Sequence, residues 1–326
     1  MEQWYPEYEC CRLCPRQCGV NRNAGQTGFC GETAALRLAW AGLHRGEEPP
    51  LCGERGSGTA FFTGCTLRCG FCQNWQISRA GMGREIPPDE LVDLFLRLQQ
   101  AGAATVNLVT GTPFLSALAW AVGVARRRGL QVPVVWNSSG YETEEAVTML
   151  HSFVDIFLPD LKTLDSDLAR RHFQAADYPA VVMKALANMA SVGPPVWSGT
   201  VLRRGLIVRH LVLPGELAAT RRVLEFFARE LKATALLSLM MQYAPPCPES
   251  GPVRRLTESE YATVVDWLAE LEIEEGFVQE PDAAAAWLPD FTRDNPFPEE
   301  YSDPLWHWRR PDVAAGNGPG AGADSP

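Results

Sequence analysis

A chain of 326 residues, of which 46% are hydrophobic and 21% charged, has the composition of a folded globular protein, which excludes a disordered or fibrous chain. The formal net charge is -10 and no basic run stands out beyond Arg126 to Arg128, so neither a nucleic acid nor an anionic membrane surface is an expected partner. The first residues, MEQWYPEYECC, have neither a cationic start nor an apolar run, and nowhere do about 18 apolar residues follow one another without a charge. We therefore expect a cytoplasmic protein.

Residues 1–55 are rich in cysteine and glycine and contain too few apolar residues to build a core alone. In a reducing compartment such cysteines predict metal binding rather than disulfides, and a metal would help this flank to fold. The spacing C-x2-C-x3-C-x11-C has the count for a tetrahedral four-thiolate site, which either zinc or an auxiliary iron-sulfur cluster accepts. Cys10 could replace the first ligand, and free thiols are the remaining alternative. The candidate ligands of this second metal site are Cys11, Cys14, Cys18 and Cys30.

From residue 59 onward, short apolar runs alternate with segments of helical spacing. A helix is expected over residues 89–102, two more between residues 165 and 192, and a last one that opens with a capping box between Thr257 and Glu260. The alternation predicts parallel βαβ units, because strands buried on both faces are apolar throughout. The expected strands span residues 59–62, 105–109, 132–136, 154–158, 206–213 and 235–241.

Three cysteines follow the first expected strand in the stretch FFTGCTLRCGFCQNW. Cys65, Cys69 and Cys72 have the spacing C-x3-C-x2-C, at the end of the strand where parallel α/β folds place their sites. Three thiolates from one loop can hold three irons of a cubane cluster and leave the fourth iron open to another ligand. A structural zinc ion would require a fourth protein ligand. Zinc and three unrelated structural cysteines are the alternatives.

This stretch resembles the cluster loop of the radical S-adenosylmethionine (SAM) superfamily. The resemblance extends to the pyruvate formate-lyase activating enzymes, and more closely to their PflX-type relatives, through the segments CRLCPRQCGVNR, VVWNSSGYE, DIFLPDLK, GLIVRHLVLPG, SLMMQYAPP and DNPFP. It implies that the amino and carboxylate groups of SAM occupy the open iron of a 4Fe-4S cluster. One electron from the cluster would then cleave SAM to methionine and a 5′-deoxyadenosyl radical.

The resemblance also implies roles for residues that follow the second and third strands. Thr110 and Gly111 stand where the superfamily often has Gly-Gly-Glu-Pro, whose backbone binds the SAM amino group; this chain keeps a glycine and the proline but lacks the glutamate. Asn137 and Ser138 stand where the activating enzymes have a segment like Asp-Thr-Asn-Gly. In those enzymes this segment helps to bind a monovalent cation beside the SAM carboxylate. Asn137 offers a neutral oxygen in place of a carboxylate, which would hold a cation more weakly.

Further candidates complete the expected cofactor site. By resemblance, Phe71 packs by the adenine of SAM, and Asp160 and Lys162 contact its ribose and carboxylate. Arg209 lies inside an apolar strand, so it faces either an anionic group at the barrel mouth or solvent at the strand edge. Gln242, at the end of the sixth strand, is a candidate contact to SAM or to the substrate.

Together these patterns predict an α/β fold, a partial (β/α)6 TIM-like barrel with an N-terminal Cys-rich extension and an irregular C-terminal tail. Six units are too few for a closed eight-stranded barrel, and an open doubly wound sheet is the alternative. The expected divisions are the metal-binding extension (1–55), the radical SAM core barrel (56–281), an aromatic and proline-rich tail packed on the core (282–310) and a disordered end (311–326).

The expected function is that of a radical SAM enzyme that abstracts a hydrogen atom. Its hydrogen donor is a glycine of a partner protein that docks over the barrel mouth, as in the activating relatives, or else another protein or a small molecule. The electron would come from a flavodoxin-like or ferredoxin-like donor. Two other classes stay open: an iron-sulfur or SAM-binding scaffold without turnover, and a zinc-stabilised nucleic-acid module, which the acidic charge disfavours.

Overall fold

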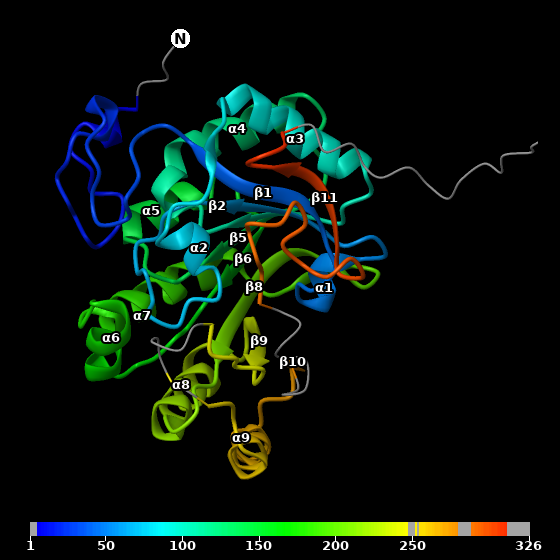
Figure 1. Cartoon of the computed structure of the whole chain (residues 1–326). Helices are drawn as coiled ribbons and strands as arrows, with labels where there is room; N and C mark the ends of the chain where they lie inside the picture. The colour runs from blue at the N-terminus through cyan, green and yellow to red at the C-terminus, as the bar shows by residue number, and fades with distance from the viewer. Residues whose placement is uncertain (1–4, 247–251, 253, 280–287, 312–326) are drawn as a thin grey trace, which may run out of the picture.

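The computed structural model describes residues 5–246, 252, 254–279 and 288–311 (Figure 1). Within them, 11 strands form one mixed sheet whose main path has the order β10-β9-β8-β6-β5-β4-β2-β1-β11. The strands are β1 (Arg37–His44), β2 (Ser57–Phe62), β3 (Arg84–Glu85), β4 (Val106–Val109), β5 (Val134–Ser138), β6 (Ile156–Pro159), β7 (Val196–Ser198), β8 (Val201–Leu211), β9 (Ala235–Met240), β10 (Gly276–Gln279) and β11 (Ser302–His307). The helices are α1 (Pro49–Cys52), α2 (Trp75–Ser78), α3 (Pro88–Gln100), α4 (Leu115–Arg127), α5 (Glu144–Leu150), α6 (Ser166–Phe173), α7 (Tyr178–Met189), α8 (Leu217–Glu230) and α9 (Glu258–Glu270).

The central part of the sheet is parallel and runs from β2 through β4, β5, β6, β8 and β9 to β10. Its first six strands overlap the six predicted apolar runs, with bounds shifted by up to five residues, and β10 adds a parallel strand that was not predicted. The path is open between its ends at β10 and β11. The predicted α/β fold with a partial TIM-like barrel is therefore confirmed.

Two antiparallel strands extend the sheet beyond β2. β1 pairs with β2 on one side and with β11 on the other. The predicted division at residue 55 therefore cuts through the sheet, because β1 and α1 precede it and are built into the barrel. The tail predicted as irregular contains one regular strand, β11, which pairs with β1 because its buried residues complete that side of the core. Beyond residue 311, the predicted disordered end lies outside the described residues.

Sequence signals mark the start of two helices, α3 and α9, and the end of α3, which spans Pro88–Gln100 where residues 89–102 were predicted. Pro88 starts α3, where its missing N–H costs nothing, and Gly102 follows the helix with a φ of 93° that favours glycine. Thr257 caps α9: its hydroxyl accepts a hydrogen bond from the Glu260 N–H at 3.2 Å, and the Glu260 carboxylate accepts one from the Thr257 N–H at 2.9 Å. The predicted capping box is confirmed.

The short helix α1 closes one end of the barrel interior. Its Leu51 is fully buried and packs among inward-facing side chains of the parallel strands, namely Val135, Ile156, Leu158 and Ile207. In Figure 1, α1 and the segment around α2 lie at opposite ends of the central strands. The interior is thus plugged at the end where α1 lies.

None of the helices in the described part of the chain is long and apolar enough to cross a membrane.

Candidate active site

A cavity of about 240 Å³ lies inside the partial barrel. It extends from the cysteine loop after β2 to the segment between β1 and α1. Almost every residue predicted from the sequence to serve the cofactor lines it: Cys65, Cys69, Phe71, Cys72, Thr110, Asn137, Ser138, Asp160, Lys162, Arg209 and Gln242. Parallel strands bring these residues together because their carboxyl ends meet at one edge of the sheet.

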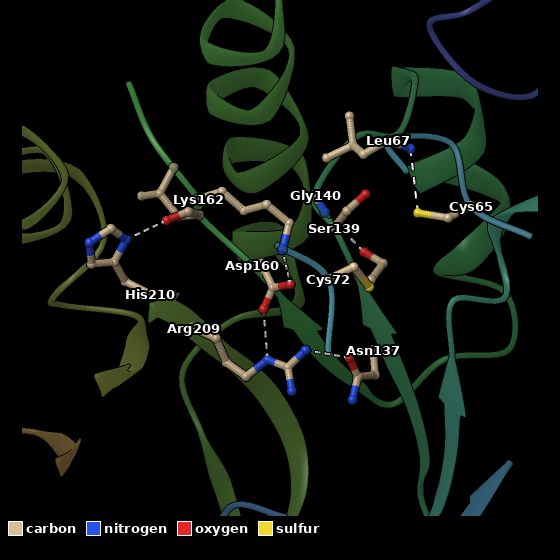
Figure 2. Close-up of polar contacts among 12 residues, drawn as sticks. Cys65, Leu67, Cys72, Asn137, Ser139, Gly140, Asp160, Lys162, Arg209 and His210 are labelled. Carbon is tan, nitrogen blue, oxygen red and sulfur yellow. Dashed lines mark hydrogen bonds and ion pairs between the residues drawn. The ribbon is translucent and has the colours of Figure 1, made fainter. Parts of the chain in front are cut away.

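The cysteine loop is held in place by close packing and by weak hydrogen bonds to sulfur. Gly64 has a φ of 71°, and a Cβ atom there would lie 2.5 Å from the side chain of Glu32, so the loop requires glycine before its first cysteine. The Leu67 N–H donates to Cys65 Sγ at 3.4 Å (Figure 2), and the Ser78 hydroxyl donates to Cys72 Sγ at 3.4 Å. These contacts define the conformation of the loop around its three cysteines.

The three thiols suit an iron-sulfur cluster in their chemistry. Cys65 and Cys69 are buried, and burial raises the pKa of both thiols, so their thiolates require a positive partner such as iron. Among the described residues, no three His, Cys, Asp or Glu side chains lie close enough together to hold one metal ion. A cubane cluster does not require such convergence, because each thiolate binds a different iron. Cys65, Cys69 and Cys72 thus fit a cluster with one iron left for another ligand.

A charged network crosses the cavity beside this loop. Asp160 lies between two cations: Lys162 Nζ is 2.7 Å from Asp160 Oδ2, and Arg209 Nε is 2.9 Å from Asp160 Oδ1 (Figure 2). Arg209 also donates a hydrogen bond to Asn137 Oδ1. Burial opposes the charge of Asp160, but Arg209 and Lys162 outweigh it and lower its pKa. Arg209 therefore faces the cavity and the carboxylate of Asp160 rather than solvent at the strand edge, and its contact with a cofactor stays a prediction.

A tyrosine beneath this network joins the ends of β5 and β6. The Tyr178 hydroxyl accepts a hydrogen bond from the Lys162 N–H at 3.0 Å and lies 2.9 Å from Ser139 O and 2.8 Å from Asp160 O. Tyr178 is fully buried. It fixes the backbone that carries Asp160 and Lys162.

Two further predicted residues, Phe71 and Gln242, line the cavity and contact neighbouring side chains. Phe71 presents its ring among the rings of His172, Phe173 and Tyr243, at centroid distances of 5.3, 5.8 and 6.4 Å. Gln242 donates to the side chain of Gln279 on β10.

Thr110 adopts a φ of 62°, an unusual value for a residue other than glycine, and its N–H donates to Asn137 O at 2.9 Å. Gly111 does not line the cavity. A Cβ atom there would lie 2.6 Å from Leu118 and 2.8 Å from the ring of Trp136, so the glycine serves packing behind the site.

The cysteines of the N-terminal flank lie in one neighbourhood away from this cavity. Burial, followed by smaller contributions from the nearby Cys30, Cys11 and Cys18, raises the pKa of Cys14 to about 12, although a backbone hydrogen bond at Arg16 lowers it. The four predicted ligands are therefore brought together, although in the described residues their side chains do not converge on a single ion. The second metal stays a prediction.

The cavity also contains acidic and imidazole groups that the sequence analysis did not identify. His44, Glu47 and Glu48 line it from the segment between β1 and α1. The only local signal was a pair of glutamates between Gly46 and two prolines, which alone would indicate a solvated loop. They line the cavity because β1 pairs within the sheet and carries the segment that follows it to the barrel interior.

A partial barrel with three cysteines after its first parallel strand defines an α/β protein that is built to hold a cofactor at its mouth. Residues 59–216 match the family model of the radical SAM superfamily. The domain formed by these residues belongs to that superfamily. The finer likeness, to the PflX-type relatives, stays a prediction.

Among curated proteins, the chain is similar to the uncharacterized protein MJ0674 of Methanocaldococcus jannaschii, with 29% identity over 245 residues. The match covers 72% of this chain and 66% of that relative's length.

Among solved structures, the chain is similar to a domain of pyruvate-formate lyase-activating enzyme from Bacteroides vulgatus, with 13% identity, a TM-score of 0.38, and 51% of this chain and 91% of that chain covered. It is similar to a radical SAM methyltransferase from Sphaerobacter thermophilus, with 15% identity, a TM-score of 0.49, and 71% and 70% covered. It is also similar to SuiB of Streptococcus suis bound to S-adenosylmethionine, with 13% identity, a TM-score of 0.44, and 69% and 48% covered. Because the sequence identities and TM-scores are this low, these three similarities give no evidence of the activity of this chain.

Proposed function

We propose that the protein is an enzyme that cleaves SAM reductively at a 4Fe-4S cluster bound by Cys65, Cys69 and Cys72 and then abstracts a hydrogen atom from a substrate. The supporting observation is that these cysteines line one cavity with charged side chains from several strand ends. When bound, the cluster supplies one electron that breaks the bond between the sulfur and C5′ of SAM, giving methionine and a 5′-deoxyadenosyl radical, which becomes 5′-deoxyadenosine on taking hydrogen from the substrate.

The residues around the loop bind and orient SAM. Lys162 and Arg209 bring positive charge to the side of the cavity where the SAM carboxylate would lie, and Asp160 holds both cations in place. Phe71 offers an apolar ring to the adenine. The burial of the loop excludes water, which protects a radical from side reactions.

The backbone after β4 and β5 completes this arrangement. Thr110 and Ser138 line the cavity, and the positive φ of Thr110 turns the chain toward it. We assign the SAM amino group to this backbone, as the superfamily resemblance implies. In this chain, the buried Glu142 lies behind Thr112 and accepts a hydrogen bond from its hydroxyl at 2.8 Å. Glu142 is therefore a positioning residue for this turn.

The substrate and partners belong to the same proposal. The hydrogen donor is a group that enters the open mouth of the barrel, such as a glycine of a docked protein, as in activating enzymes. The electron comes from outside the chain, from a flavodoxin-like or ferredoxin-like protein. The N-terminal cysteines bind a second metal, zinc or an iron-sulfur cluster, that helps the flank to fold.

The test is anaerobic reconstitution with iron and sulfide, followed by addition of SAM and dithionite and measurement of 5′-deoxyadenosine. We expect product from the wild type and none from Cys65→Ala, whose cluster lacks one of its ligands. Cys52→Ala is the matched control, because Cys52 belongs to neither predicted metal site and does not line the cavity.

The other outcomes are equally informative. No product from the wild type, despite a fully loaded cluster, would mean a protein that binds the cluster without turnover. Tightly bound zinc at Cys65, Cys69 and Cys72, with iron absent, would exclude radical chemistry.

A further inference from the structure

The cavity has a second end that the proposed reaction does not use. His44 pairs with Ser57 at the amino end of β2, whereas the cysteine loop follows the carboxyl end of the same strand. The segment after β1 therefore places His44, Glu47 and Glu48 at the far end of the cavity from the proposed cluster, above the plug formed by α1. We call this group of three residues the floor of the cavity.

The floor contains two carboxyl groups that make no direct ion pair with a described residue, although the charge of Arg209 attracts both. Glu48 is 3% exposed; its Oε1 accepts a hydrogen bond from the Ser238 hydroxyl at 3.0 Å, while its Oε2 has no hydrogen-bond partner in the described part of the chain. Neither Glu47 nor Glu48 forms an ion pair with another described residue. The two cations that line the cavity, Lys162 and Arg209, are both paired with Asp160.

Electrostatics at the floor favours an additional cation. Burial, and then the neighbouring Glu48, raises the pKa of Glu47 to about 7. Arg209 and a hydrogen bond with Asn107 act in the opposite direction, Asp160 raises the pKa slightly further, and burial with Glu48 outweighs the two lowering contributions. A positive group between the two glutamates would stabilise both in the ionised form, because it offsets the repulsion and the lost hydration together.

The histidine supplies a hydrogen-bond donor beside these acids. His44 is 5% exposed, and its Nδ1 accepts a hydrogen bond from the Gly46 N–H at 3.2 Å. Burial lowers its pKa to about 4, so the ring is neutral near pH 7 and carries its proton on Nε2. Among the described residues, Nε2 has no hydrogen-bond partner. A buried donor of this kind is costly unless a ligand satisfies it.

We propose that the floor binds the cationic group of the substrate, a protonated amine or guanidinium that pairs with Glu47 and Glu48 and carries a hydrogen-bond acceptor for His44 Nε2–H. This proposal rests on the proposed function and names the substrate class for the same cavity. Two aromatic rings, Phe61 and Phe297, line the cavity beside the floor, and their centroids are 5.4 Å apart. Aromatic rings suit an organic cation, because their faces attract positive charge. A substrate anchored here extends toward the cysteine loop.

The test uses matched probes that differ only in charge. Calorimetry on the reconstituted, SAM-loaded protein compares butylguanidinium with its neutral isostere butylurea. A second pair, the pentapeptide Ac-Ala-Ala-Arg-Ala-Ala-amide and the same peptide with citrulline, represents a protein side chain. We expect the charged member of at least one pair to bind about tenfold more tightly or better than its neutral partner. The pair with the higher affinity distinguishes a free small molecule from a side chain of a protein.

Variants assign the binding to the floor. Glu48→Gln should weaken the charged probe by about tenfold or more, while Glu54→Gln, at an exposed glutamate outside the cavity, should leave it unchanged. If Glu48→Gln does not fold, as judged by thermal unfolding, Glu47→Gln takes its place because Glu47 is more exposed.

Two outcomes would overturn the inference: equal affinity for charged and neutral probes, or wild-type affinity in the folded Glu48 or Glu47 variant. These readouts do not depend on turnover. If the wild type binds the charged probe through Glu48 but forms no 5′-deoxyadenosine, the proposed reaction fails and the cation site stands.

Discussion

The substitution Asp160→Asn tests the charged network at the centre of the site. Asp160 pairs with Lys162 at 2.7 Å and with Arg209 at 2.9 Å, and the exposed fractions of the three side chains are 16%, 19% and 17%. Asparagine keeps the shape and one acceptor oxygen but removes the negative charge. Two cations would then lie side by side in the cavity without a counter-charge, which is the costly state of a broken buried ion pair.

The expected magnitude follows from this burial. Removing one partner of a buried ion pair costs roughly 3–5 kcal/mol. The lower end, about 3 kcal/mol, applies here because each side chain keeps some access to solvent. For a large domain, 1 kcal/mol corresponds to roughly 2 °C in Tm, so we expect Asp160→Asn to unfold about 6 °C below the wild type.

Thermal unfolding by circular dichroism provides the measurement, with Asp167→Asn as the control. Asp167 pairs with Arg170 on the surface and is 84% exposed, so its loss should lower Tm by no more than about 2 °C. SAM binding should weaken in Asp160→Asn alone. If Asp160→Asn unfolds at the wild-type temperature, the network contributes little to stability and the reasoning is wrong.

Three further predictions concern other parts of the molecule. Tyr178→Phe should destabilise the fold by about 1–3 kcal/mol and raise the Kd for SAM, because the backbone N–H of Lys162 loses its acceptor. Urea unfolding measures the stability and titration measures the Kd for SAM. An unchanged Kd would contradict a positioning role for Tyr178. Trp306→Ala, in the tail strand β11, should lower the free energy of unfolding in urea by about 3–5 kcal/mol, because Trp306 is 2% exposed. The control Trp197→Ala, at a residue 45% exposed, should change it by less than about 0.5 kcal/mol. Equal effects of the two variants would mean that the tail does not belong to the core. Binding of butylguanidinium should strengthen as the pH rises through about 7, because Glu47 is protonated below its raised pKa and charged above it; in Glu47→Gln the pH dependence should disappear, and its persistence would assign it to another group.

The parallel half of the fold was predictable because its signals are local. A strand buried on both faces is an apolar run in the sequence, as in VNLV of β4, and each run is followed by its own helix. The capping box at Thr257 and the glycine after α3 likewise depend only on residues within a few positions of each other. The cysteine loop belongs to the same class, because its three ligands lie within eight residues.

The antiparallel strands escaped prediction because their partners are distant in the sequence. β1 is an ordinary apolar stretch inside a cysteine-rich flank, and β11 is a short strand inside a proline-rich tail. β11 pairs with β1, and β1 lies between β2 and β11, so both strands depend on partners elsewhere in the chain. No local pattern records that pairing.

The sequence by itself determined that three cysteines follow the first parallel strand. This arrangement also determines the kind of cofactor that the chain is suited to hold. Only the tertiary structure decided what faces that cofactor across the cavity. The antiparallel direction of β1 returns His44 to the start of β2 and brings Glu48 to Ser238, 190 residues further along the chain. The physical reason is that the charge state and partners of a buried group depend on its neighbours in space, which only the folded chain brings together.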